Sequence, residues 1–302
     1  METIRIGILG YGEVGRIFAA GLQSASGVGA LTAWDRKLTD PASADADVLR
    51  SAAGHAGVTL GDGIVTLCDQ ATLIISAVTA SSTLEVAQQA ALHIRPGSMF
   101  LDLNSASPGT KQQAAAVIEA AGAHYVEAGV MTSVPPYGIA VPMLLGGAQA
   151  ETLAQTLRGW GMNVQPVAQR IGVASAVKMC RSIMIKGLEA LVIESYATAR
   201  HYGVEQLVLP TLAETFPQID WSAQGAYFFS RVVQHGKRRA EEMREAARTV
   251  REAGVVPLMA SAIADKQDWM ATLAAQGLFA DIFPKAPWQN YADRLLAQFS
   301  PD

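Results

Sequence analysis

The sequence has few cysteines, few charged residues and no long uninterrupted apolar run. Its two cysteines, Cys68 and Cys180, are far apart and not in a metal-ligand spacing, so we expect neither a disulfide framework nor a bound metal. Charged residues are only 17% of the chain and form no basic block, which disfavours binding to nucleic acid. No apolar run approaches the roughly 18–20 residues that a membrane-spanning helix needs, so no membrane partner is expected.

Apolar residues, by contrast, are abundant. They make up 50% of the 302 residues, which is enough for a large core and speaks against disorder. A chain of this length suits two domains. The opening residues, METIRIGILG, lead directly into a strand and contain no basic segment of a secretory signal, so we expect a cytoplasmic protein.

Strand-like and helical patterns alternate over the first part of the chain. The expected strands are residues 4–10, 30–35, 72–78, 98–104, 124–130, 140–147 and 163–167. Their alternation with helices of about 10–15 residues indicates parallel βαβ units. From residue 171 onward only helical periodicity occurs, with Pro210, Pro217 and Pro257 expected to separate helices. The prediction is an α/β domain over residues 1–168 and an all-helical domain over residues 169–302.

A glycine-rich turn follows the first expected strand and precedes a helix. Its sequence has the GxGxxG pattern of dinucleotide-binding loops, and we expect the whole loop to contact a cofactor: Gly10, Tyr11, Gly12, Glu13, Val14 and Gly15. In such a loop the first glycine permits the turn, the second lets a pyrophosphate approach, and the third allows close packing. The helix start supplies N–H groups for the phosphates. An ordinary glycine-rich turn is the alternative.

Further cofactor contacts are expected at the ends of the next two strands. Asp35 lies 20 residues beyond Gly15, where an acidic side chain accepts hydrogen bonds from a ribose, which favours NAD. The adjacent Arg36 and Lys37 favour NADP, because either cation can pair with a 2′-phosphate. Val78 and Thr79 complete the expected set. Both cofactors stay open, with the preference on NAD.

The segment 101–111, LDLNSASPGTK, brings polar side chains to the end of a buried strand. Ligands of open α/β sheets bind at this edge. Asn104 and Ser105 can donate and accept hydrogen bonds, so we expect them to bind a substrate. A loop that only caps the following helix is the alternative, because Ser, Asn and Asp all favour that position.

Residues 172–203 form one long expected helix with two cations one turn apart. Lys178 and Arg181 repel each other at this spacing, and a snorkelling lysine is the simplest interpretation of the first. Lys186 lies about 80° round the helix from Lys178 and is expected at the surface or an interface.

These motifs together resemble the β-hydroxyacid dehydrogenase superfamily, which includes 3-hydroxyisobutyrate and 6-phosphogluconate dehydrogenases. That family has an N-terminal GxGxxG, a D-x-[SN]-[ST]-x-x-P loop and a GxxGxxxK-type motif that opens a long interdomain helix. The chain has the glycine loop, then Asp102 to Pro108, then Gly172 with Lys178. The resemblance implies a Rossmann-type α/β domain joined by that helix to an all-α domain, and it makes Lys178 the general acid/base.

The resemblance also has departures. The family's SGG segment is replaced by Met131-Thr132-Ser133, and Arg181 and Ser182 stand where an asparagine is usual. Arg181 would lower the pKa of Lys178 and bind an anionic group of a substrate, with Ser182 beside it. The usual downstream lysine–aspartate pair is replaced by the segment 235–243, HGKRRAEEM, as in relatives whose C-terminal domain is poorly characterised.

In that segment, His235, Arg238 and Arg239 are candidates for an anion site, and a charged solvent-facing helix is the alternative. The expected function is NAD(P)-dependent hydride transfer to or from a small anionic hydroxy acid. An imine reductase, a phosphosugar dehydrogenase and a non-catalytic dinucleotide sensor are the other hypotheses. Lys178 argues against the first, and the missing His-Asn pair against the second. The resemblance further implies a homodimer, to which the apolar segments 189–197 and 227–233 would contribute.

Overall fold

The structure is a computed structural model that describes residues 3–284 and 286–299. Contacts within the chain divide it into two compact units, Met1–Met179 and Cys180–Asp302. The division falls inside one long helix rather than at the predicted boundary of 168/169, because the first turns of that helix pack on the sheet of the first unit. Among the described residues, no helix has the length and apolar character needed to cross a membrane.

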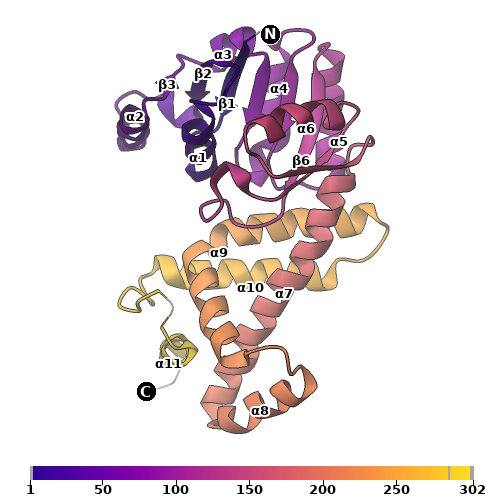
Figure 1. Ribbon diagram of the computed structural model, residues 1–302. Helices are drawn as coiled ribbons and strands as arrows, with labels where there is room; N and C mark the ends of the chain where they lie inside the picture. The colour runs from indigo at the N-terminus through magenta and orange to yellow at the C-terminus, as the bar shows by residue number, and fades with distance from the viewer. Residues whose placement is uncertain (1–2, 285, 300–302) are drawn as a thin grey trace. The chain divides into compact units, whose positions relative to one another are not determined.

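The first unit is built on an eight-stranded sheet with the order β3-β2-β1-β4-β5-β6-β7-β8. The strands run in sequence as β1 (Ile4–Leu9), β2 (Val28–Trp34), β3 (Thr59–Leu60), β4 (Leu73–Ser76), β5 (Met99–Asp102), β6 (His124–Val130), β7 (Met143–Gly146) and β8 (Val164–Ala168). The central strands, β1 and β4, are short apolar runs, which suits strands that are covered on both faces. Figure 1 shows this sheet among the indigo and magenta elements.

Helices cover both faces of the sheet. They are α1 (Glu13–Leu22), α2 (Ala44–Ala56), α3 (Ile64–Gln70), α4 (Thr83–Ala91), α5 (Pro108–Ala120) and α6 (Ala150–Gly159). One core cluster contains side chains of α1, α2 and α6, and a second contains side chains of α3, α4 and α5. The doubly covered sheet confirms the predicted Rossmann-type fold of the first part of the chain.

One strand pair departs from the predicted parallel arrangement. β6 and β7 pair antiparallel, with Glu127 opposite Gly146 and Val130 opposite Met143. Only a short 3₁₀ helix, Gly138–Ala140, lies between them, so no crossover helix carries the chain back to the other end of the sheet. The remaining neighbouring strands are parallel.

In its described part, the second unit contains helices joined by turns and loops, and no strand. Its helices are α7 (Val173–Tyr202), which begins in the first unit, α8 (Glu205–Thr215), α9 (Trp221–Glu252), α10 (Leu258–Ala275) and α11 (Trp288–Phe299), as Figure 1 shows. Pro217 and Pro257 lie between helices as predicted, but Pro210 lies inside α8. The apolar segments assigned to dimerisation mostly form this unit's own core, which includes Ile193 and Phe229.

Candidate functional site

The glycine loop between β1 and α1 is a tight turn with open space on one side. Gly10 has a φ of +91°, and a Cβ atom there would lie 2.6 Å from the carbonyl oxygen of Ala77. A Cβ at Gly15 would lie 1.9 Å from the carbonyl oxygen of Gly10. A Cβ at Gly12 would meet no atom within 4 Å, so the backbone there is open to a ligand. Gly10 and Gly15 thus permit the turn and the close packing that the motif predicts, and the approach of a pyrophosphate at Gly12 stays a prediction.

The start of α1 is available to an anion. Its N-cap residue is Gly12, which has no side chain to accept hydrogen bonds from the first N–H groups, and Glu13 and Val14 begin the helix. The side chain of Tyr11 is fully buried, and its backbone N–H donates to Asp35 Oδ2 at 2.8 Å. Burial raises the pKa of the Tyr11 hydroxyl, and the charge of Arg16 opposes this shift. A contact between Tyr11 and the cofactor stays a prediction, and the buried hydroxyl takes no part in it.

Asp35 lies at the end of β2 beside this loop. Its Oδ2 accepts the Tyr11 N–H at 2.8 Å, and its Oδ1 accepts the Lys37 N–H at 3.0 Å. These two bonds fix the carboxylate next to the glycine turn. Lys37 forms an ion pair with Asp45 at 2.8 Å, whereas the side chain of Arg36 is exposed at the same rim.

Asn104 links the ends of two neighbouring strands. Its Oδ1 accepts the Val78 N–H at 2.7 Å, and its Nδ2 donates to Ser76 Oγ at 3.0 Å. Only 3% of Asn104 is exposed. Its amide is therefore engaged inside the protein, where it holds the loop that contains Val78 and Thr79 in place beside the glycine turn.

A buried charged network supports Asn104, and sequence reasoning missed most of it. Asp102 Oδ1 accepts the Asn104 N–H and pairs with Lys111 Nζ, both at 2.8 Å, and Asp102 Oδ2 accepts the Tyr125 hydroxyl at 2.5 Å. The pKa of Tyr125 is raised well above its usual value, first by burial and then by the Asp102 charge. The signal that was available is a polar residue, Asp102, at the end of a largely buried strand.

Two predicted site residues that are far apart in sequence meet in the first unit. The ammonium group of Lys178, on α7, donates a hydrogen bond to Ser105 Oγ, in the loop after β5. Both side chains are partly exposed, so each remains accessible from solvent. The polar loop at the carboxyl end of β5 and the lysine helix thus converge at the sheet edge where the glycine loop also lies.

Comparison with known proteins agrees with this geometry. Residues 5–165 match the family model described as the NAD binding domain of 6-phosphogluconate dehydrogenase. The chain belongs to this family. In the helical unit, residues 199–270 match a domain of unknown function, DUF1932. Both matches confirm the predicted resemblance, including the uncharacterised C-terminal domain.

The similarity to solved structures extends over nearly the whole chain. A conserved hypothetical protein from Sinorhizobium meliloti 1021 is 35% identical, covers 99% of this chain and 97% of its own, and has a TM-score of 0.77. The protein MTH1747, of unknown function and described as similar to 3-hydroxyacid dehydrogenases, is 30% identical over 91% of this chain and 99% of its own, with a TM-score of 0.69. The Mycobacterium tuberculosis 3-hydroxyisobutyrate dehydrogenase is 16% identical over 97% and 99%, with a TM-score of 0.69, and shows the shared fold alone.

The remaining predicted site residues belong to the helical unit. Arg181 is exposed on α7, one turn after Lys178. Ser182 is buried, and its Oγ accepts a hydrogen bond from Lys186 Nζ at 3.3 Å. Lys186 was expected at the surface or an interface, but it is only 7% exposed and pairs with Glu242 at 2.8 Å, which neutralises its charge.

The candidates on α9 separate into one structural residue and two that reach solvent. Arg239 is buried and forms a two-pronged ion pair with Glu189, so it is not available to bind an anion from outside. The side chain of Arg238 is 50% exposed and lies 3.7 Å from Glu242. His235 is partly exposed on the same helix. Only Arg238 and His235 therefore remain as candidates for the predicted anion site.

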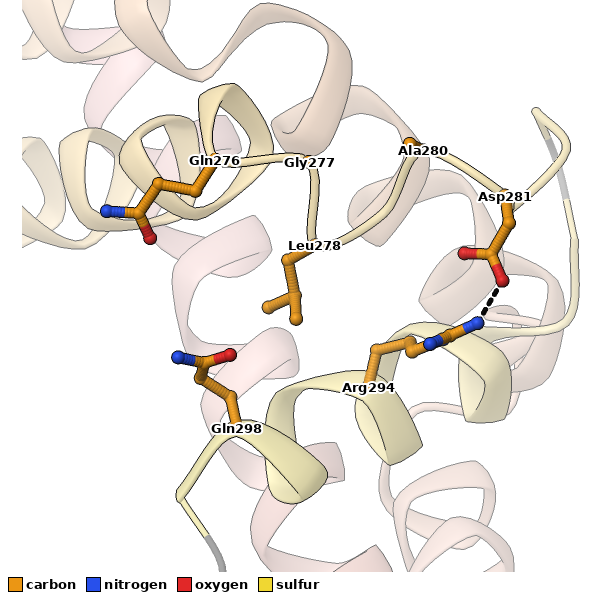
Figure 2. A pocket seen from close by; sticks show the side chains of 7 residues that line it. All are labelled: Gln276, Gly277, Leu278, Ala280, Asp281, Arg294 and Gln298. Atoms are coloured by element: carbon orange, nitrogen blue, oxygen red, sulfur yellow. Dashed lines mark hydrogen bonds and ion pairs between the residues drawn. The ribbon is translucent and has the colours of Figure 1, made fainter.

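A pocket of about 530 Å³ lies in the helical unit, between the end of α10 and α11 (Figure 2). Its lining residues are Gln276, Gly277, Leu278, Ala280, Asp281, Arg294 and Gln298. Arg294 points toward Asp281 and pairs with it, so its charge is neutralised within the protein (Figure 2). None of the predicted site residues lines this pocket.

Proposed function

We propose that this protein is an NAD(P)-dependent oxidoreductase that moves a hydride between nicotinamide and a small anionic hydroxy acid, with Lys178 as the general acid/base. The observation that supports this proposal most directly is the hydrogen bond from Lys178 to Ser105. It joins a proton-transferring group to a polar side chain at the carboxyl end of β5, the edge at which open α/β sheets bind their ligands.

The proposed reaction divides between the cofactor and the protein. Held at the glycine loop and the start of α1, NAD(P)⁺ would supply the acceptor for the hydride of the carbinol carbon. The neutral amine of Lys178 accepts the hydroxyl proton as the C=O bond forms, and the resulting ammonium returns a proton in the reverse direction. Ser105 orients the oxygen that gains or loses this proton, by the same hydrogen-bonding capacity with which it now accepts from Lys178.

The residues of the first unit fit a dinucleotide. Gly12 leaves open space beside the backbone, and the start of α1 has N–H groups without a side-chain cap. Between the two forms of the cofactor we propose NAD, because Asp35 is fixed at the loop and its charge repels a 2′-phosphate. Lys37 is paired with Asp45, so Arg36 alone would have to compensate this repulsion.

The proposed substrate carries a carboxylate or phosphate. Arg181 supports this part of the proposal, because it places a permanent cation one turn after Lys178 on the same helix. Arg238, with His235, is the proposed secondary anion contact in the helical unit. We also propose that the protein forms a homodimer through its helices.

Replacement of the lysine tests the proposed function. Lys178→Met should lower kcat/KM by about 10²–10⁴-fold while the dissociation constant for NADH stays nearly unchanged, because the lysine acts on the substrate proton and not on the nucleotide. Lys266→Met, which removes a lysine of α10 paired with Glu194, is the control and should keep full activity. Retained turnover in Lys178→Met would refute the catalytic role. NADH binding without oxidation of any hydroxy acid in a broad panel would instead favour a dinucleotide sensor.

A further inference from the structure

The helix that contains Lys178 begins without a cap of its own. The first N–H groups of an α-helix have no partner inside the helix and usually bond to a side chain at its start. The residue before α7 is Gly172, which has no side chain and a φ of +104°, and the first turn contains no acidic residue. The first turn is nevertheless buried at Ala174 and Ser175, where water cannot satisfy these groups.

Glu127, on β6, supplies the missing acceptor. Its Oε1 accepts the N–H groups of Gly172 at 2.7 Å and Ala174 at 3.0 Å, and its Oε2 accepts the N–H of Ser175 at 3.3 Å. The side chain is fully buried, so these bonds act without competition from water. A carboxylate at this end also interacts favourably with the positive end of the helix dipole. We call this set of three bonds the Glu127 cap.

Two glycines make room for the cap and for the helix. Gly146 lies opposite Glu127 in the β6–β7 pair, and a Cβ there would be 2.6 Å from Glu127 Oε1. Gly129 lies two residues after Glu127 on the same face of β6. A Cβ at Gly129 would be 2.8 Å from the carbonyl oxygen of Ala174 and 3.6 Å from Cβ of Lys178. The backbone of α7 therefore packs directly against β6, next to the position from which the Lys178 side chain extends.

We propose that Glu127 is a positioning residue for Lys178, and that the Glu127 cap with Gly129 sets where the ammonium group meets Ser105. Ser105 belongs to a different element, the loop after β5, so the bond between them depends on where α7 is held. This inference rests on the proposed role of Lys178. A displacement of about 1 Å in such an arrangement can reduce a rate by as much as 10²-fold.

Chemical reactivity of the lysine tests the positioning without any need for turnover. In full-length protein, trace labelling with acetic anhydride followed by mass spectrometry compares Lys178 with Lys37, an exposed lysine paired with Asp45. In Glu127→Gln one oxygen is lost and an amide donor faces the backbone N–H groups, so Lys178 should react several-fold faster relative to Lys37. Gly129→Ala should do the same by displacing the helix, and Glu119→Gln, which changes an exposed acid on α5, should not. Unchanged reactivity of Lys178 in both variants would overturn the inference.

Turnover supplies the second readout. In Glu127→Gln, kcat should fall by about 10–100-fold while NADH affinity is retained. Leu157→Ala, a core change in α6, is a control for loss of stability alone and should retain kcat. If the wild-type protein oxidises a hydroxy acid and Glu127→Gln does so at the same rate, the positioning role is wrong and the proposed function stands. If the wild-type protein oxidises none, the proposed function is wrong, and the labelling result still decides whether Glu127 positions Lys178.

Discussion

The charge of Lys111 is buried, and the carboxylate of Asp102 compensates it. Lys111 and Asp102 are separated by 2.8 Å, and each side chain is 1% exposed. Lys111→Met would leave the Asp102 carboxylate without its counter-ion in a medium of low dielectric constant, which should reduce the free energy of unfolding by about 3–5 kcal/mol. The matched control is Lys37→Met, because Lys37 and Asp45 are also 2.8 Å apart but exposed. The control should lose less than about 1 kcal/mol in the same urea titration. Equal losses would contradict this account.

Cys68 is a second buried titratable residue, and its effect depends on pH. Burial raises the pKa of its thiol from 9.0 to about 12. Below the unfolded value both states hold the proton, so the contribution of the thiol to stability is complete. As pH rises above 9, the unfolded thiol ionises first, and stability should fall by about 1 kcal/mol by pH 10. Between pH 8 and pH 10, urea titrations should show a fall that is about 1 kcal/mol larger in Cys180→Ser than in Cys68→Ala, because tyrosines whose pKa burial raises, such as Tyr125, lower stability in both variants. The same fall in both variants would assign it to other groups.

At the residue scale, the sequence predicts the side chains that belong to a motif. It does not predict the hydrogen bonds that hold those side chains in place. Lys178 and Ser105 were expected at the site, and they are in contact. Asn104 was expected to bind a substrate, yet its amide bonds to Val78 and Ser76. No local sequence pattern indicates these two hydrogen bonds. A polar residue at a strand end gives the same sequence pattern whether its side chain faces a ligand or a neighbouring loop.

Among elements, the pair α9 and α10 depends on close approach at one glycine. A Cβ at Gly236 would lie 2.7 Å from the carbonyl oxygen of Gln267, on the facing helix. Gly236→Ala should destabilise the protein by about 1–3 kcal/mol, because a helix backbone cannot move aside as a side chain can. Gly54→Ala is the matched control, since Gly54 is also in a helix, α2, but has open space around it. It should be neutral or stabilising by up to about 1 kcal/mol through helix propensity, as measured by thermal unfolding. Stabilisation by both substitutions would disprove the close contact.

The long apolar strands and the parallel pairing of most of them were predictable, and the antiparallel direction of β7 was not. β1 and β6 lie where the apolar runs place them. The two-residue strand β3 is too short to leave a pattern, and the antiparallel direction of β7 depends on how the chain returns after β6 rather than on the strand itself. The Glu127 cap was also beyond prediction, because 45 residues separate Glu127 from Gly172. The available signal was negative, namely a long helix with no capping residue.

At the scale of the whole molecule, each unit has its own core. Two clusters lie on the two faces of the sheet, and a third, with Tyr196, Phe229 and Trp288, lies among the helices. Large apolar side chains nevertheless remain exposed on the helical unit. Met184 is 73% exposed and Leu191 is 58% exposed. They are seven residues apart on α7, so they share one face of that helix.

The exposed face of α7 leads to a prediction about assembly. Wild-type protein should elute with twice the mass of one chain in size-exclusion chromatography with light scattering, because burial of such side chains between two copies removes apolar surface from water. The double variant Met184→Glu/Leu191→Glu should elute as a monomer, because carboxylates at these positions oppose burial between two copies. Both positions are exposed on a single chain, so the new charges stay hydrated there. Leu92→Glu, at a position that is 76% exposed in the first unit, should remain a dimer. A monomeric wild-type protein would refute the homodimer, and a dimeric double variant would place the interface on another face.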